Sequence, residues 1–430
     1  MKIVHITPGT GGVFYCQNCF RDSELIKALI ALGNEVHNVP IYLPLNTNDH
    51  DDLIVDTPVF YGAVNVYLKE KIPIYRKAPL WLERIFDSDT VLNYAAKKSA
   101  STEAAGLEEM TISMLKGEEG RQATELDHLI KYLAKEIKPD IVHLSNALLL
   151  GLARRLKNDL GAKVVCSLQD ENEWVDLMDE SYQQEVWDLM AERASDAALF
   201  ISSSKFFAKK SEVQMKLPAE KIAVVYGGIN LDGYQESVLP FDPPVIGYLR
   251  RMSKDYGLDI LIDAFIRLKK EKDFKNLKLY ITGGYTDIDK HFVDQQFRRI
   301  AQSGFKDDVK VFDRFDKASR IDFLKSLTLL SVPVPQGESF GAYQVEALAS
   351  GVPIVQPDAG SYPEFIEATQ GGVIYEKNDG KHLADAAASL LKDPEKVKKM
   401  GQQGREAVRK KFTVRNMAED MVKAYESILE

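Results

Sequence analysis

The sequence predicts an α/β protein of two domains, each built on a doubly wound parallel β-sheet. The chain has 430 residues, which is too many for one core and fits two domains of roughly 200 residues each. Short apolar strands alternate with helical patterns along most of the chain, as in parallel sheets covered by helices. The run Phe241-Asp242-Pro243-Pro244 resembles a linker. We therefore expect one domain over residues 1–238 and a second over residues 239–412.

The first domain opens with a strand over residues 2–7, a glycine-rich turn, a helix over 18–32 and a strand over 35–40. The turn contains Gly11 and Gly12, but it lacks the third glycine and the later acidic residue of a dinucleotide-binding fingerprint. Its backbone N–H groups carry no side chains that would hinder a ligand. The turn is therefore either one wall of a ligand cleft or a simple tight turn.

The remainder of the first domain is irregular over residues 46–120 and regular after residue 139. The irregular part indicates an insertion, and its place beside the first domain's cleft makes it a candidate element for acceptor specificity. The regular part alternates strands and helices, and polar residues follow its strands. Ligands of open α/β sheets bind at this carboxyl edge. These polar residues are Ser145, Asn146, Gln169, Asp170 and Ser203.

The second domain has the same alternation, and its strands also end in chemically informative residues. The strand over 245–248 precedes Arg251 and Lys254, and the strand over 278–281 precedes Gly283 and Gly284. Cations beside bare backbone N–H groups suit a diphosphate.

The stretch from Ser331 to Glu367 organises this domain. It begins as an apolar strand and then places Glu338 and Glu346 on either side of a Phe340-Gly341 turn before a helix. An ionised carboxylate accepts two hydrogen bonds from a vicinal diol. Together with a diphosphate site, this pair predicts a nucleotide-sugar ligand. Two alternatives stay open: a glycoside hydrolase acid and nucleophile, and two carboxylates that merely flank a helix.

Composition narrows the class of protein. The formal net charge is −9, which argues against a nucleic-acid partner. No window reaches the ~18 apolar residues of a membrane span, and the start MKIVHITPG reads as a strand and turn rather than a leader. Three cysteines are too few for a disulfide framework, and an odd count favours a reducing compartment. We expect a cytoplasmic protein with at most peripheral membrane contact, through basic and aromatic residues between 67 and 98.

Cys16 and Cys19 form a C-x-x-C pattern after the first glycine-rich turn. Zinc needs about four ligands, and only Cys166 and scattered histidines remain to complete such a site. A redox pair at a helix start is a second interpretation, and packing beside a cleft is a third. We expect no metal site.

The run PQGESFGAYQVEALASGVP, from Pro335 to Pro353, resembles the paired-glutamate signature of the GT-B glycosyltransferases of family 4, the large retaining group also called glycosyltransferase group 1. The resemblance implies two Rossmann-like domains that face each other across a cleft. It also implies a last helix, about residues 413–430, that packs back on the first domain.

Carried over to this sequence, the resemblance implies a role for each matching residue. Glu338 and the amides of Phe340, Gly341 and Ala342 would bind donor-sugar hydroxyls, and Glu346 would hold the ribose diol. Arg251 matches the family's phosphate arginine. Two positions depart from the family. The lysine that binds phosphate in the family aligns with Tyr256 here, and Lys254 is the nearest substitute. Gln169 stands where the family often has a histidine that approaches the sugar.

The implied activity is transfer of a sugar, with retention of configuration, from a nucleotide-diphospho-sugar to an acceptor hydroxyl, without metal or cofactor. Its implied catalytic residues are Glu338, Arg251 and Lys254. The donor and a carbohydrate or other hydroxyl acceptor would be the partners. Two rivals are a nucleotide-sugar epimerase or hydrolase on the same fold and a non-catalytic nucleotide-sugar binder. The further expected donor-binding residues are Gly11, Gly12, Gln169, Gly283 and Gly284.

Overall fold

The computed structural model describes residues 1–8, 15, 17–42, 60–61 and 106–429. Its contacts divide the chain into two compact units. The first unit comprises Met1–Gly12, Asn18–Tyr226 and Met417–Glu430, and the second comprises Val13–Gln17 and Gly227–Asn416. The basic and aromatic stretch between 67 and 98 lies outside the described residues.

The first unit contains a six-stranded sheet in the order β2-β1-β3-β4-β5-β6. Every neighbouring pair is parallel. The strand order changes direction between β1 and β3, which is the kind of position where open α/β sheets bind ligands. The strands are β1 Lys2–Thr7, β2 Glu35–Pro40, β3 Ile141–Leu144, β4 Lys163–Leu168, β5 Leu199–Ser202 and β6 Ile222–Val224.

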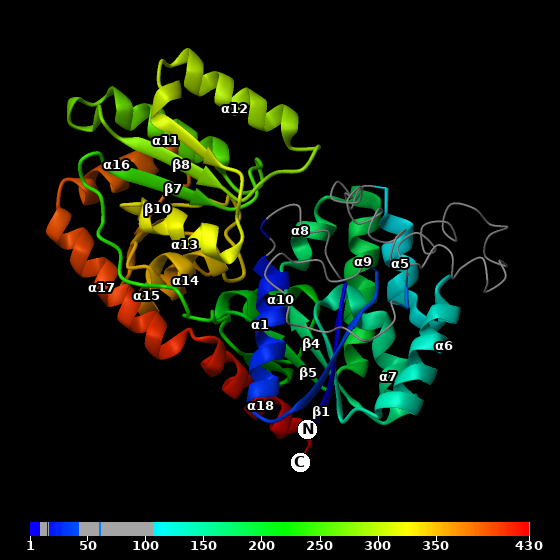
Figure 1. The fold of residues 1–430 in the computed structure, drawn as a ribbon. Coiled ribbons are helices and arrows are strands. Elements are labelled where there is room, and N and C mark those ends of the chain that lie inside the picture. Colours follow the sequence, from blue (N-terminus) through cyan, green and yellow to red (C-terminus); the bar gives the residue numbers. More distant parts are fainter. Residues whose placement is uncertain (9–14, 16, 43–59, 62–105, 430) are drawn as a thin grey trace. The chain divides into compact units, whose positions relative to one another are not determined.

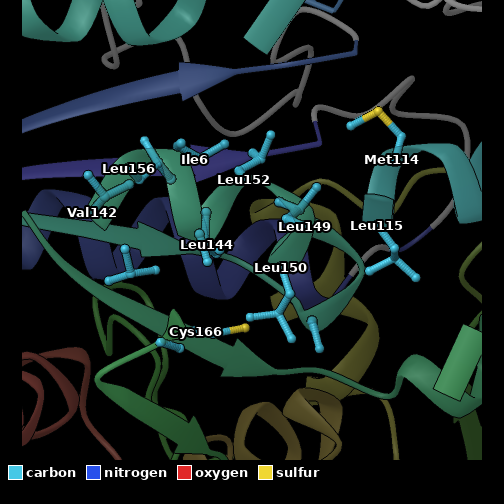
Figure 2. Packing of buried hydrophobic residues seen from close by; sticks show 14 of the residues in the cluster. Ile6, Met114, Leu115, Val142, Leu144, Leu149, Leu150, Leu152, Leu156 and Cys166 are labelled. Carbon is cyan, nitrogen blue, oxygen red and sulfur yellow. The ribbon is translucent and has the colours of Figure 1, made fainter. Parts of the chain in front are cut away.

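Helices cover both faces of this sheet (Figure 1), so its central strands are buried on both sides. Figure 2 shows part of this core, to which Ile6, Val142 and Leu144 of the sheet contribute together with Leu149 and Leu150. The insertion predicted over 46–120 lies mostly outside the described residues. The helices are α1 Gln17–Ala31, α5 Glu108–Lys116, α6 Ala123–Tyr132, α7 Ala153–Leu160, α8 Glu171–Val175, α9 Glu180–Arg193, α10 Lys205–Gln214 and α18 Val414–Leu429.

The second unit contains another six-stranded parallel sheet, in the order β12-β11-β10-β7-β8-β9. Its order changes direction between β7 and β10, so the ends of these two strands are again a favoured ligand position. The strands are β7 Val245–Leu249, β8 Lys278–Thr282, β9 Val309–Phe312, β10 Leu329–Leu330, β11 Ile354–Pro357 and β12 Gly372–Tyr375.

Helices flank this sheet as well, and the predicted fold class of two doubly wound parallel sheets is confirmed. The helices are α11 Leu258–Lys270, α12 Lys290–Gln302, α13 Lys317–Lys325, α14 Ala342–Ala349, α15 Tyr362–Thr369, α16 Gly380–Leu391 and α17 Pro394–Lys411.

One sequence prediction is wrong in this unit. The apolar run from Ser331 was expected to be a strand, but β10 ends at Leu330. Pro333 and Pro335 have no N–H to donate to a ladder. Val332 N–H bonds instead to the Gln356 side chain, at 3.1 Å. The chain therefore leaves the sheet early, and this irregular segment leads to the two glutamates.

Candidate active site

Glycines fix the turn that carries Glu338. Gly341 has φ +80°, and a Cβ there would come within 2.7 Å of Gln344 Nε2 and 3.0 Å of Glu338 Oε2. Gly337 has φ +69°, and a Cβ there would come within 2.3 Å of the Gly360 nitrogen. L-residues with side chains avoid this backbone region. The two glycines thus let the turn pack tightly and place Glu338 four residues before the start of α14.

Glu338 is a buried carboxylate that is held by an arginine. Its side chain is 0% exposed, and Arg250 Nη2 lies 2.7 Å from Glu338 Oε1, with Arg250 Nε at 2.8 Å from the same oxygen. The Arg250 guanidinium carbon lies 3.9 Å from the centre of the Tyr256 ring, which is cation–π geometry. Arg250 is therefore fixed on two sides, and it fixes the orientation of Glu338 in turn.

Glu346 lies on α14, is 3% exposed, and accepts hydrogen bonds from three side chains. Oε1 accepts from Arg320 Nε at 2.8 Å and from Tyr234 Oη at 2.5 Å. Oε2 accepts from Tyr15 Oη at 2.8 Å. Burial, and next the nearby Glu346 charge, raise the pKa of both tyrosines well above the usual value of 10.0. Both hydroxyls therefore remain protonated donors at neutral pH.

The two cations predicted to bind phosphate have different surroundings. Arg251 donates to both Asp289 oxygens, from Nε at 2.8 Å and from Nη2 at 3.1 Å, and Nη2 also donates to Thr286 Oγ1 at 3.1 Å. Lys254 is exposed on the loop between β7 and α11. The arginine that contacts Glu338 is Arg250, which the sequence pattern alone does not distinguish from Arg251. Successive residues at a strand end point to opposite faces, so only one of the two neighbouring arginines could face α14.

Gly283 and Gly284 follow β8, beside the end of β7. A Cβ on Gly283 would come within 2.3 Å of the Arg250 carbonyl oxygen, and Met252 N–H donates to Gly284 O at 2.8 Å. The structure therefore packs this glycine pair against the backbone that carries Arg250. Glycines, cations and carboxylates meet at the carboxyl edge of the second sheet.

Gln169 is the predicted site residue of the first unit that the structure describes. Gln169 follows β4 and donates from Nε2 to Asp22 Oδ1 of α1 at 3.1 Å, while its backbone N–H bonds to Glu171. Asp170 has φ +56°, a conformation that is uncommon for a residue with a side chain. Gly11 and Gly12 lie outside the described residues.

The described residues contain no group of three or more His, Cys, Asp or Glu side chains that could hold a metal ion. Cys19 is disulfide-bonded, and Cys166 on β4 is a buried free thiol. Cys16, the other cysteine of the C-x-x-C pattern, is not among the described residues. Within the part of the chain that the structure describes, no helix combines the length and apolar character of a membrane span.

Two family models match the chain in succession. The Glycosyltransferase Family 4 model matches residues 99–232, and the Glycosyl transferases group 1 model matches residues 234–407. The chain belongs to the GT-B glycosyltransferases of group 1.

Curated relatives match part of the chain. A lipopolysaccharide core biosynthesis mannosyltransferase of Rhizobium meliloti is 25% identical over 198 residues, which are 45% of this chain and 55% of the relative. An N-acetyl-alpha-D-glucosaminyl L-malate synthase of Bacillus anthracis is 29% identical over 194 residues, 42% of this chain and 48% of the relative. The chain thus spans about half the length of these relatives.

Two solved structures share the fold over nearly all of both chains. Sucrose-phosphate synthase from Thermosynechococcus elongatus matches with a TM-score of 0.70 at 17% identity, over 99% of this chain and 98% of that one. Anabaena Alr3699/HepE in complex with UDP and glucose matches with a TM-score of 0.69 at 16% identity, over 99% and 100%. At these identities the likeness establishes the GT-B fold.

Proposed function

We propose that this glycosyltransferase moves a sugar from a nucleotide-diphospho-sugar to an acceptor hydroxyl, with retention of configuration and without a metal ion. The observation that carries the proposal is the pair Glu338 and Glu346, which are both buried and are each oriented by an arginine. Glu338 precedes α14 by four residues and Glu346 lies within the helix. Carboxylates oriented in this way suit the hydroxyls of a sugar and of a ribose.

The donor would lie along the carboxyl edge of the second sheet. Glu346 would accept from the ribose diol, and Glu338 would accept from hydroxyls of the transferred sugar. The N–H groups of residues 340–342, at the positive end of α14, would bind sugar or phosphate oxygens. Arg251 and Lys254, beside Gly283 and Gly284, would neutralise the diphosphate.

In the proposed mechanism the acceptor hydroxyl attacks the anomeric carbon on the face from which the diphosphate departs. The new glycosidic bond forms as the bond to the diphosphate breaks, and the acceptor's proton leaves with the diphosphate. Arg251, Lys254 and the α14 amides stabilise the departing charge, which lowers the barrier electrostatically. The proposed mechanism assigns both glutamates to binding and orientation of the donor and neither to covalent catalysis, with Glu338 held by Arg250 and Glu346 by Arg320.

We further propose a cytoplasmic protein whose acceptor is a carbohydrate or another hydroxyl compound, with no nucleic-acid partner and at most peripheral membrane contact. Alr3699/HepE was solved with UDP-glucose, so UDP-hexoses are the first donors to test.

The test is incubation with a panel of nucleotide-sugars, with and without sugar acceptors, followed by measurement of released nucleoside diphosphate. Release that requires an acceptor, with a product that retains the donor's anomeric configuration and forms in the presence of EDTA, supports the proposal. Release or isomerisation without acceptor supports an epimerase or hydrolase. Binding without turnover supports a non-catalytic binder, the rival that the Tyr256 and Gln169 departures favour.

A further inference from the structure

Two side chains near the N-terminus occupy groups of the second unit that the donor would need. Tyr15 and Gln17 are grouped with that unit, and they are only 1% and 5% exposed. Tyr15 Oη donates to Glu346 Oε2 at 2.8 Å. Gln17 Oε1 accepts from the Ala342 N–H at 3.1 Å, and Gln17 Nε2 lies 3.4 Å from Glu338 Oε1.

Glu346 can accept only a few hydrogen bonds, so the one from Tyr15 takes an acceptor position that a ribose diol would need. Each carboxylate oxygen offers about two acceptor positions. On Oε1 both are used, by Tyr234 and Arg320. On Oε2 one is used, by Tyr15. A ribose diol needs two, so it can donate both its hydroxyls to Oε2 only when the Tyr15 hydroxyl has left.

Gln17 occupies a second donor-binding group, the backbone N–H at the start of α14. A backbone amide has one N–H, and the N–H of Ala342 is taken by the Gln17 side chain. The Gln17 side-chain oxygen thus takes the position that an oxygen of the donor would take on this N–H. The Gln17 NH₂ group faces Glu338, as a hydroxyl of the donor sugar would. The Tyr15 backbone N–H also donates to Gly283 O at 3.1 Å, so four residues of the proposed donor site contact this pair.

We infer that Tyr15 and Gln17 form a substrate-mimicking plug, which occupies the donor-binding groups and must be displaced by the nucleotide-sugar. The inference rests on the proposed function, because it takes Glu346, Glu338 and the Ala342 N–H as donor-binding groups. Tyr15 and Gln17 compete with the nucleotide-sugar for these groups, so the plug lowers the affinity for the donor.

Calorimetric titration of the full-length protein with UDP, GDP and ADP tests the plug. Tyr15→Phe deletes only the hydroxyl that occupies Glu346. We expect it to bind the preferred nucleotide about tenfold more tightly than the wild type, the equivalent of one hydrogen bond to a charged group. Tyr375→Phe is the matched control, since it deletes a buried hydroxyl of the same unit that bonds to Asn378. It should leave affinity unchanged.

Hydrogen–deuterium exchange supplies a readout without ligand. In free Gln17→Ala protein, the Ala342 amide should exchange faster than in the wild type, and nucleotide-sugar should restore its protection. Unchanged exchange overturns the Gln17 contact. Unchanged or weaker nucleotide binding by Tyr15→Phe, with normal binding by the wild type, overturns the plug alone. If neither protein binds any of the three nucleotides, the proposed function and the inference both fail.

Discussion

Arg250 and Glu338 form a buried ion pair, with Arg250 Nη2 2.7 Å from Glu338 Oε1 and side chains 5% and 0% exposed. Removing one partner of such a pair leaves a charge without compensation in a site away from water, which costs about 3–5 kcal/mol. The pair is thus both a structural element of the second unit and the device that orients Glu338.

Arg250→Met should therefore destabilise the second unit by about 3 kcal/mol, measured as the urea dependence of circular dichroism. The double variant Arg250→Met/Glu338→Gln should recover most of that loss, because it buries no lone charge. Arg267→Met serves as the control. Arg267 pairs with Asp263 at a similar 2.7 Å, but its side chain is 51% exposed, so we expect no measurable change. If the stability losses of Arg250→Met and Glu338→Gln simply added in the double variant, the two side chains would not form a stabilising ion pair.

Gly341 and Gly304 offer a matched test of the turn before α14. They have nearly the same backbone, with φ +80° and +82°, but a Cβ on Gly304 meets nothing within 4 Å. Each alanine variant should lose about 1–2 kcal/mol of stability through the backbone alone. Only Gly341→Ala should also lower sugar transfer, at least tenfold, because its Cβ displaces Glu338. Equal turnover of the two variants would show that the turn need not be tight.

Buried tyrosines predict a loss of stability in alkaline solution. Tyr343 and Tyr362 bond to each other at 2.8 Å, and burial, followed by the Glu338 charge, raises the pKa of both well above 10.0. Below pH 10 folded and unfolded chains keep these protons. Above it only the unfolded chain releases them, so the free energy of unfolding falls as pH rises, by about 1.4 kcal/mol per pH unit for each group.

Denaturant unfolding measured between pH 9 and 12 checks this expectation. Tyr343→Phe should reduce the dependence on pH by the contribution of one group. If Tyr343→Phe had the same pH dependence of unfolding as the wild type, the pKa of Tyr343 would be the same in the folded and the unfolded chain.

Local patterns in the sequence were enough to predict the sheets and the position of the two glutamates. Strand length, helical spacing and glycine breaks placed β7, β8 and α1 within one residue, because these signals are local. The irregular segment after β10 could have been anticipated from Pro333 and Pro335, since proline interrupts a strand ladder.

The partners of the glutamates could not be predicted, because they come from distant parts of the chain. Arg320, Tyr234 and Tyr15 are separated from Glu346 by 26, 112 and 331 residues. No local period marks a tyrosine for such a contact; its burial and position follow from tertiary packing. The choice of Arg250 over Arg251 likewise depends on which face of the strand end meets α14.

We propose that the two glutamates bind different parts of one nucleotide-sugar. Measuring nucleoside diphosphate affinity and turnover for Glu346→Ala and Glu338→Ala separates the two roles, with Glu367→Ala at an exposed position of α15 as the control. Glu346→Ala should weaken nucleotide binding about tenfold or more. Glu338→Ala should reduce kcat by a similar factor, with little change in nucleotide affinity. Unchanged nucleotide affinity in Glu346→Ala would contradict the assignment of Glu346 to the ribose.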